Sequence, residues 1–335
     1  MDFEQFGQFT VKSLHDGRKE ITDGIGRKLL LVPRGNKPLK GDEEARTVRV
    51  PVEKVVVYSA YNAALIKELG RVNSIAGVIS PEERWYIPEI REGIRDGKIS
   101  YIGEYKSIDY EKLKALKPNV VFTWDEGIIP KLEELSIPCV LTSTRIAKDL
   151  ASHINFIQFL SAFYGEEEMA KSFVDAQFKE IDEISAGWKE AKSKPKVVWG
   201  DIYERKVLVE PGNSWAGQMV EKAGGDYLFH DLEGASCMQV TLEKFFSRTK
   251  GADILVTYRG PESGITSKER LRQSSRLLQA VEINPMNEGS IYFTGCRLYQ
   301  TADVAGIIGE LASLLHPGLF PEQKTPEYFF KLQDK

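Results

Sequence analysis

The chain has 335 residues, a length that suits two lobes of about 150 residues each better than a single core. Hydrophobic residues make up 42% and charged residues 28%, which is typical of a folded globular protein and excludes a disordered one. The net charge of −4 gives no basic excess, so we expect no nucleic-acid partner. No apolar run reaches the length of a membrane-spanning helix.

The first 50 residues predict an extended N-terminal arm (residues 1–50). Residues 21–27 carry turn-forming residues between polar strands, residues 29–33 predict a strand, and residues 34–46 predict a surface loop. The N-terminal residues 1–5 lack the basic and apolar regions of a signal peptide. This leaves two alternatives, a cytoplasmic protein or one whose leader is absent from this chain.

Regular alternation of strands and helices begins after residue 51. The predicted strands lie at residues 54–58, 74–79, 101–103, 119–123 and 138–141, and the predicted helices at residues 62–69, 110–116 and 128–135. Alternation of this kind predicts an α/β lobe, residues 51–146, with a mostly parallel sheet covered by helices on both faces.

Residues 147–192 show no strand pattern and predict two helices separated near Gly165. The second helix, at residues 166–191, would be about 39 Å long, which is enough to connect two lobes. An ordinary helix packed on one lobe remains an alternative, because periodicity alone does not distinguish the two.

The alternation resumes in residues 193–335, the predicted C-terminal lobe. Strands are expected at residues 196–199, 207–209, 252–257 and 290–293, and helices at residues 214–223 and 301–315. The two lobes resemble each other weakly. Glu111 opens a helix that leads into a strand at 120–122, and Glu243 opens one that leads into a strand at 254–256. A repeat of the whole Rossmann-like lobe explains this similarity.

Aromatic residues and arginines follow many of the predicted strands. In open parallel sheets, ligands bind at the carboxyl ends of the strands, and these residue types supply broad contact faces and forked donors. The segments after the strands therefore predict a site for a bulky, partly aromatic, anionic ligand. Its candidate residues are Tyr61, Trp85, Tyr86, Trp124, Tyr203, Arg205, Trp215, Tyr258, Arg259, Arg297 and Tyr299. The alternative for each aromatic residue is that it packs beneath its own loop.

Enzymatic patterns are poor, and we predict no catalytic residue, no metal site and no cofactor. The four histidines (His15, His153, His230 and His316) are far apart in sequence. The chain has no GxSxG and no P-loop pattern. The three cysteines (Cys139, Cys237 and Cys296) show no CxxC spacing and are expected to be small apolar fillers.

Several stretches, in this order, resemble the cobalamin and iron-siderophore receptor family, whose two lobes are joined by one long helix. These are residues 21–27, 55–58, 69–70, 75–78, 109–121, 221–226 and 315–317. The segment Asp109–Val121 is the most specific match. The resemblance implies a helical-backbone periplasmic binding protein with its ligand held between the lobes. A continuous connecting helix also implies small lobe motion on binding.

The resemblance also implies roles for particular residues. Glu111 and Glu243 match the glutamates that dock on the membrane permease, although the helix dipole alone favours acids at such positions. Trp124 matches a tryptophan of the ligand site in cobalamin receptors. Cys237 and Met238 fall where those receptors have a second tryptophan, which makes both candidate ligand-binding residues. Cys237 departs from the family pattern, as does the insertion at residues 34–46.

We therefore expect the substrate-binding component of an ABC importer that captures an iron-siderophore-type metal complex. Its partners would be a permease dimer with its ATPase subunits and a metal-chelate ligand. Its location would be the periplasm or, through a lipid anchor, the outer face of the membrane. The alternatives are a corrinoid, haem or oxyanion receptor of the same fold, a two-lobed α/β enzyme, or a scaffolding protein.

Overall fold

The computed structural model describes residues 3–37, 46–143, 149–204, 206–234, 237–320 and 325–334. The chain divides into two compact units. Unit 1 comprises Met1–Arg145, Ile154–Asp175 and Tyr299–Ala302, and unit 2 comprises Ile146–His153, Ala176–Leu298 and Asp303–Lys335. Among the described residues, no helix combines the length and the apolar character needed to cross a membrane.

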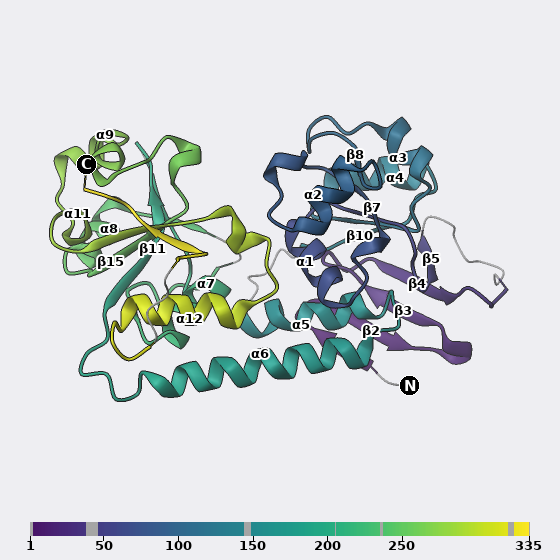
Figure 1. Ribbon diagram of the computed structural model, residues 1–335, viewed down its shortest axis with the longest axis horizontal. Coiled ribbons are helices and arrows are strands. Elements are labelled where there is room, and N and C mark those ends of the chain that lie inside the picture. The colour runs from purple at the N-terminus through teal and green to yellow at the C-terminus, as the bar shows by residue number, and fades with distance from the viewer. Residues whose placement is uncertain are drawn as a thin grey trace. The chain divides into compact units, whose positions relative to one another are not determined.

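The first element of unit 1 is a five-stranded sheet, in the order β1-β2-β3-β4-β5 (Figure 1). Its strands are β1 (Phe3–Phe6), β2 (Phe9–Ser13), β3 (Lys19–Thr22), β4 (Lys28–Pro33) and β5 (Thr47–Val50). Neighbouring strands are antiparallel except β4 and β5. The expected extended arm is therefore a folded sheet. Alternate side chains such as Phe9 and Val11 are buried, and the Phe9 ring lies 4.7 Å from that of Phe156.

The turn between β3 and β4 attaches this sheet to the central sheet of unit 1. Gly24 N–H donates to the carbonyl of Leu141 at 2.9 Å, and Leu141 N–H donates to Asp23 Oδ2 at 3.1 Å. Arg27 pairs with Asp23 at 2.9 Å and donates to the carbonyl of Cys139 at 2.8 Å. Through these contacts the β3–β4 turn pairs with strand β10, the edge strand of the central sheet.

The central sheet of unit 1 is wholly parallel, with the strand order β10-β9-β6-β7-β8. Its strands are β6 (Val55–Val57), β7 (Ile75–Val78), β8 (Ser100–Tyr101), β9 (Val120–Thr123) and β10 (Cys139–Leu141), and its helices are α1 (Ala60–Glu68), α2 (Pro88–Arg95), α3 (Tyr110–Leu116) and α4 (Ile129–Glu134). The strand order reverses between β6 and β9. The predicted α/β lobe with a parallel sheet is confirmed.

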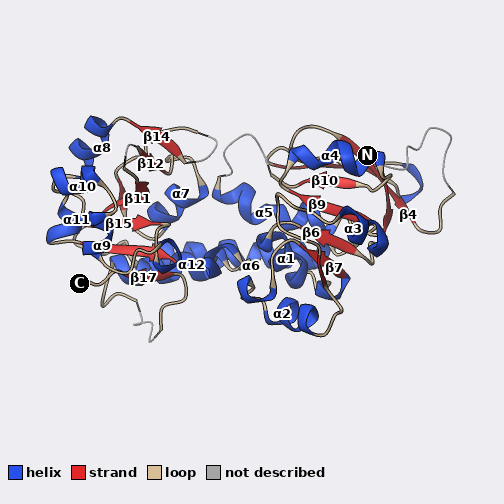
Figure 2. Cartoon of the chain, turned by 90° about the horizontal axis from the view of Figure 1, so that it is seen from above, coloured by secondary structure: helices blue, strands red, loops and turns tan. Residues whose placement is uncertain are grey.

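Unit 2 contains a mixed sheet with a parallel centre (Figure 2). Strands β13, β11, β15 and β16 are parallel neighbours, while β12, β14 and β17 add antiparallel pairs. The strands are β11 (Lys196–Ile202), β12 (Val207–Val209), β13 (Asp226–Tyr227), β14 (Met238–Val240), β15 (Ile254–Thr257), β16 (Ser290–Thr294) and β17 (Phe329–Lys331). The helices are α7 (Trp215–Lys222), α8 (Leu242–Thr249), α9 (Lys268–Gln273), α10 (Arg276–Ala280), α11 (Asn284–Asn287) and α12 (Val304–Leu315). The strand order reverses between β11 and β15.

Two helices, α5 (Leu150–Ser161) and α6 (Glu167–Gly187), contribute residues to both units. Helix α6 has 21 residues and ends at Gly187, four residues before the predicted end at Ala191. Trp188 follows it and donates through its indole nitrogen to the carbonyl of Lys222 at 2.8 Å. The boundaries of the connector and of the two lobes stay predictions.

Candidate functional site

Each unit has a point where its strand order reverses, and such points favour ligand binding at the carboxyl ends of the strands. In unit 1 this point lies after β6 and β9, where Tyr58 and Trp124 follow the strands. In unit 2 it lies after β11 and β15, where Tyr203 and Tyr258 follow them. We call these two regions the unit-1 edge and the unit-2 edge, and describe each by itself.

The unit-1 edge carries an exposed pair of aromatic rings. Trp124 is 37% exposed and Tyr105 is 42% exposed, and their ring centroids lie 4.6 Å apart. The indole N–H of Trp124 donates to the carbonyl of Tyr58 at 3.3 Å, which orients the ring. Burial, followed by the nearby charges of Tyr110 and Asp125, raises the pKa of Tyr58. The two rings are inclined by 44° to each other, and the pair offers an exposed aromatic surface that can contact a ring system of a ligand.

The other unit-1 candidates differ in exposure. Tyr86 is 48% exposed, whereas Trp85 is only 3% exposed and donates through its indole nitrogen to the carbonyl of Ser80 at 3.0 Å. Trp85 thus packs beneath its own loop. Tyr61 lies in the first turn of α1 and is half-buried, and burial raises its pKa.

A segment from the far C-terminal part of the chain completes this region. Gln300 accepts from Tyr86 N–H at 2.8 Å through Oε1 and donates to the carbonyl of Arg84 at 2.8 Å through Nε2. Its neighbour Tyr299 is 44% exposed. Tyr299 and Tyr86, which are separated by more than two hundred positions in sequence, therefore belong to the same unit.

The unit-2 edge is built on two buried carboxyl groups, Asp201 and Glu210. Asp201 accepts from the hydroxyl of Thr257, from Tyr258 N–H at 3.1 Å and from Tyr203 OH at 3.4 Å. Glu210 accepts from Tyr258 OH at 2.7 Å. Tyr258 therefore links the two carboxyl groups, through its main chain to one and its hydroxyl to the other.

Cys237 is the third member of the Glu210 group. Its thiol donates to Glu210 Oε1 at 2.7 Å. Burial, and then the negative charge of Glu210, raise the pKa of this thiol, so it stays protonated at neutral pH. Met238, the next residue, is half-buried in β14. The expected apolar filler is thus a hydrogen-bond donor in a polar group.

Two of the three predicted arginines, Arg259 and Arg297, make contacts within the protein. Arg259 donates to the carbonyl of Ile202 at 2.6 Å, and its guanidinium lies 5.2 Å from the centre of the Tyr203 ring. Burial of the Tyr203 hydroxyl, and then the negative charge of Asp201, raise the pKa of Tyr203. Arg297 is exposed and pairs with Glu327 at 3.2 Å. Arg205 lies outside the described residues.

Trp215 stacks on a histidine that was not among the predicted site residues. The rings of Trp215 and His153 lie 5.0 Å apart with an interplanar angle of 13°, and both residues belong to unit 2. Leu150 N–H, one turn before His153, donates to Gln218 of α7 at 2.7 Å. The isolated position of His153 in the sequence gave no indication of this partner.

The two predicted docking glutamates occupy equivalent places. Glu111 and Glu243 are both exposed, and each is the second residue of its helix. In each case the preceding cap residue, Asp109 or Thr241, accepts from the backbone N–H three residues later. Helix α3 leads into β9, which lies beside β6, the first strand of the parallel sheet in unit 1. Helix α8 leads into β15, which lies beside β11, the first parallel strand of unit 2.

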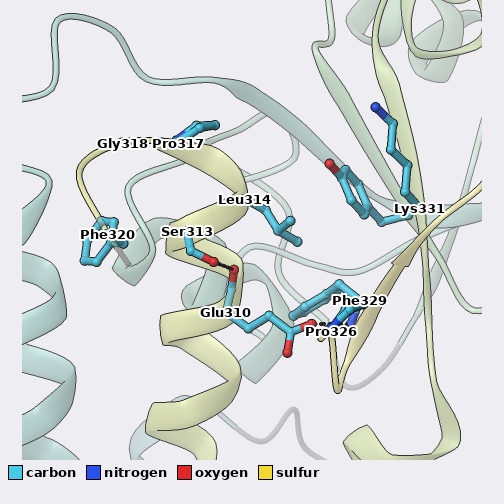
Figure 3. Close-up of a pocket in the computed structure, with 10 residues that line it drawn as sticks. Glu310, Ser313, Leu314, Pro317, Gly318, Phe320, Pro326, Phe329 and Lys331 are labelled. Carbon is cyan, nitrogen blue, oxygen red and sulfur yellow. Dashed lines mark hydrogen bonds between the residues drawn. The ribbon is translucent and has the colours of Figure 1, made fainter. Parts of the chain in front are cut away.

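A separate pocket of about 590 Å³ lies in unit 2 between α12 and the β16–β17 pair (Figure 3). None of the predicted site residues lines it. Glu310, one of its lining residues, is 1% exposed and accepts from the backbone N–H groups of Glu327, Tyr328 and Phe329 at 2.8–3.0 Å. In the sequence, Glu310 is the one charged residue of the apolar segment that forms α12, and this pattern indicates that its side chain is buried.

Within the described ranges no three His, Cys, Asp or Glu side chains lie close enough to hold a metal ion. Two α/β units, each with aromatic and polar side chains gathered at the carboxyl ends of parallel strands, define a two-lobed binding protein. A model of the periplasmic binding protein family matches residues 55–286, so the chain belongs to this family. Members of the family are not enzymes, and the chain is a substrate-binding protein of an ABC importer.

Similar proteins extend this result. The chain is 28% identical over 331 residues to an uncharacterized lipoprotein of Methanocaldococcus jannaschii, covering 93% of this chain and 78% of that one. It is 23% identical over 157 residues to the vitamin B12-binding protein of Vibrio parahaemolyticus, covering 45% of this chain and 54% of that one.

Solved structures with the same fold include three binding proteins. One from Veillonella parvula covers 92% of this chain and 98% of its own at 16% identity, with a TM-score of 0.65. A heme-binding protein of Pseudomonas aeruginosa covers 84% and 98% at 13% identity, with a TM-score of 0.64. A siderophore-binding protein of Vibrio cholerae, bound to Fe³⁺-Desferal, covers 80% and 99% at 18% identity, with a TM-score of 0.58. The predicted two-lobed α/β fold is confirmed.

Proposed function

We propose that this substrate-binding protein captures an iron-siderophore-type metal complex and delivers it to a membrane permease. The observation that carries the proposal is the exposed Trp124–Tyr105 pair at the unit-1 edge. Two exposed aromatic rings in contact are costly to leave in water and supply a rigid surface for a bulky ligand. The unit-2 edge adds phenol groups, from Tyr203 and Tyr258, that suit the oxygen-rich rim of a chelate.

A corrinoid is the second candidate. It is favoured by the similarity to vitamin B12-binding proteins over about half of their length. Cys237 at the position of a family tryptophan counts against it, because a thiol that donates to Glu210 offers no flat ring for the corrin to contact.

The proposed partners and location follow from the family. The importer would supply a permease dimer with ATPase subunits, and Glu111 and Glu243 would dock on it. The relative from M. jannaschii is a lipoprotein. We propose the same setting for this chain, namely the outer face of the membrane or the periplasm.

Titration of the full chain with ferric hydroxamates, ferric catecholates, haem, cyanocobalamin and molybdate tests the proposal. We expect saturable binding of a ferric chelate, measured by calorimetry and by quenching of tryptophan fluorescence. Trp124→Leu should weaken it by about tenfold, because a buried aromatic contact is lost. Trp188→Leu is the matched control, since Trp188 follows α6, donates to the carbonyl of Lys222 and belongs to neither edge. Binding of molybdate alone, or of none of these compounds, contradicts the proposal.

A further inference from the structure

The described residues contain four buried acidic side chains, and two of them have a clear structural role. Asp23 pairs with Arg27 at 2.9 Å and accepts from backbone N–H groups of its own turn. Glu310 accepts from three consecutive backbone N–H groups. Both charges are compensated, as buried carboxylates require. The remaining two are Asp201 and Glu210, at the unit-2 edge.

The negative charge of Glu210 is compensated much less than the charges of Asp23 and Glu310. Its side chain is 6% exposed, and both of its donors, Tyr258 OH and Cys237 Sγ, lie on the same oxygen, Oε1, at 2.7 Å. Within the described part of the chain, Oε2 accepts no hydrogen bond and Glu210 takes part in no ion pair. A neutral hydroxyl and a weakly donating thiol do not offset the desolvation of a full negative charge.

Two described cations, Arg259 and Lys206, lie over the Tyr203 ring, and neither forms an ion pair with Asp201 or Glu210. Arg259 donates to the carbonyl of Ile202 at 2.6 Å and lies over the Tyr203 ring. Among the residues that the structure describes, Asp201 likewise has only uncharged donors, namely Thr257, Tyr203 and the backbone of Tyr258. The unit-2 edge therefore gathers two acidic groups, linked by Tyr258, with no cation paired to either among the described residues.

We propose that this acidic pair recognises a positive charge on the cargo, and that the cargo is a cationic metal chelate, such as one that bears a protonated amine. This inference rests on the proposed function and narrows it. It replaces the anionic ligand that the arginines suggested, because the two described arginines, Arg259 and Arg297, make contacts within the protein. Oε2 of Glu210 is the atom that would accept from the ammonium group, while Oε1 stays bonded to Tyr258 and Cys237.

The test uses two ferric trihydroxamates that differ only in charge. One carries a free primary amine, and in the other this amine is acetylated. We expect the unaltered full chain to bind the amine-bearing chelate about tenfold more tightly, as is typical of a charge pair in a partly desolvated site. Calorimetry at several salt concentrations measures this preference, which should decrease as salt increases.

Glu210→Gln removes the charge and keeps an acceptor for Tyr258 and Cys237, and we expect the preference to fall below about twofold. Glu282→Gln is the matched control, because Glu282 is exposed in the same unit and its substitution makes the same change in net charge. It should keep the full preference.

Four outcomes overturn the inference, and they differ in what they say of the proposed function. Equal affinity of the unaltered chain for both chelates overturns the inference alone, as does a preference that survives Glu210→Gln. Tighter binding of haem or cyanocobalamin than of the amine-bearing chelate also overturns it, and leaves a metal-complex receptor standing. Failure of every compound to bind overturns both.

Discussion

The amide of Gln300 spans the main chain on either side of Trp85, since it accepts from Tyr86 N–H at 2.8 Å and donates to the carbonyl of Arg84 at 2.8 Å. One side chain thus satisfies two backbone groups of an exposed loop, as a paired strand would. The loop that holds the exposed Tyr86 is fixed by a residue more than two hundred positions later.

Replacing Gln300 with Ala should free this loop. We expect the amide hydrogen of Tyr86 to exchange about fivefold faster, since a net hydrogen bond contributes about 1 kcal/mol. Hydrogen exchange followed by mass spectrometry or NMR measures this. Gln279→Ala removes an exposed glutamine in unit 2 and should leave Tyr86 unchanged. An unaltered exchange rate in Gln300→Ala contradicts the role assigned to Gln300.

Gly24 should tolerate no side chain. A Cβ atom there would lie 1.6 Å from the carbonyl oxygen of Ser143, so the turn must move away and lose its bonds to Leu141. We expect Gly24→Ala to destabilise unit 1 by about 3 kcal/mol. Gly35→Ala is the control, because a Cβ at Gly35 would contact nothing within 4 Å. Thermal unfolding followed by circular dichroism compares the two, and equal midpoints would refute the close approach.

Cys296 should react slowly with alkylating agents near neutral pH. Burial, then the hydrogen bond to Glu262 and its negative charge, raise the pKa of the thiol to about 11. The thiolate is therefore scarce below that pH. Glu262→Gln removes the charge and should lower the pKa, so alkylation at pH 9 should become several times faster. Mass spectrometry of the Cys296 peptide across pH 7–11 measures the rate, with the exposed Glu288→Gln as control. An alkylation rate whose pH dependence does not change in Glu262→Gln would argue against Glu262 as a cause of the raised pKa of Cys296.

Glu310→Gln should loosen strand β17. An amide has one accepting oxygen where the carboxylate has two, and its NH₂ group would face the backbone N–H groups of Glu327, Tyr328 and Phe329. We expect a loss of about 2 kcal/mol in local stability, seen as faster hydrogen exchange at Tyr328 and Phe329. Glu269→Gln, on an exposed helix surface, should have no such effect. Protection that persists in Glu310→Gln would contradict this account.

The proposed docking role predicts a separation between binding and transport. Glu111→Gln and Glu243→Gln should leave cargo affinity unchanged and reduce uptake in vesicles that contain the importer, by about tenfold when combined. Each variant keeps the cap residue of its helix, so folding should not change. Glu92→Gln, an exposed acid on α2, is the control. Uptake at the unaltered rate in the double variant would remove both residues from the docking surface.

Local sequence patterns were enough to predict the parallel strands and several of the helices. Helix α3 was predicted at its observed bounds, because Asp109 caps its start and Pro118 prevents its continuation. The N-terminal sheet differs from the predicted arm. Its alternation of polar and apolar residues is that of strands with one exposed face, and the sequence does not show what covers the other face. The contact of Phe9 with α5 identifies the buried face. Short edge strands such as β14 and β17 depend on partners far away in sequence.

The candidate site was harder to predict than the fold. The sequence places Trp85, Tyr86 and Trp124 after strands, but only the structure separates the buried Trp85 from the other two. It also indicated arginines as anion donors, whereas Arg259 stacks on Tyr203 and Arg297 pairs with Glu327. Glu210 follows a predicted strand but was not among the predicted site residues. Nothing in the nearby sequence shows that its donors come from Cys237 and Tyr258, which lie 27 and 48 residues away.

The position of Gln300 also bears on how the chain is made. Unit 1 includes Tyr299–Ala302, so its last piece leaves the ribosome only after most of unit 2, up to Leu298, has been synthesised. Until then the loop at Arg84 and Tyr86 lacks the amide that pairs with it. The first unit to emerge is thus among the last to be finished, and the nascent chain must hold an incomplete unit 1 in solution while unit 2 is translated.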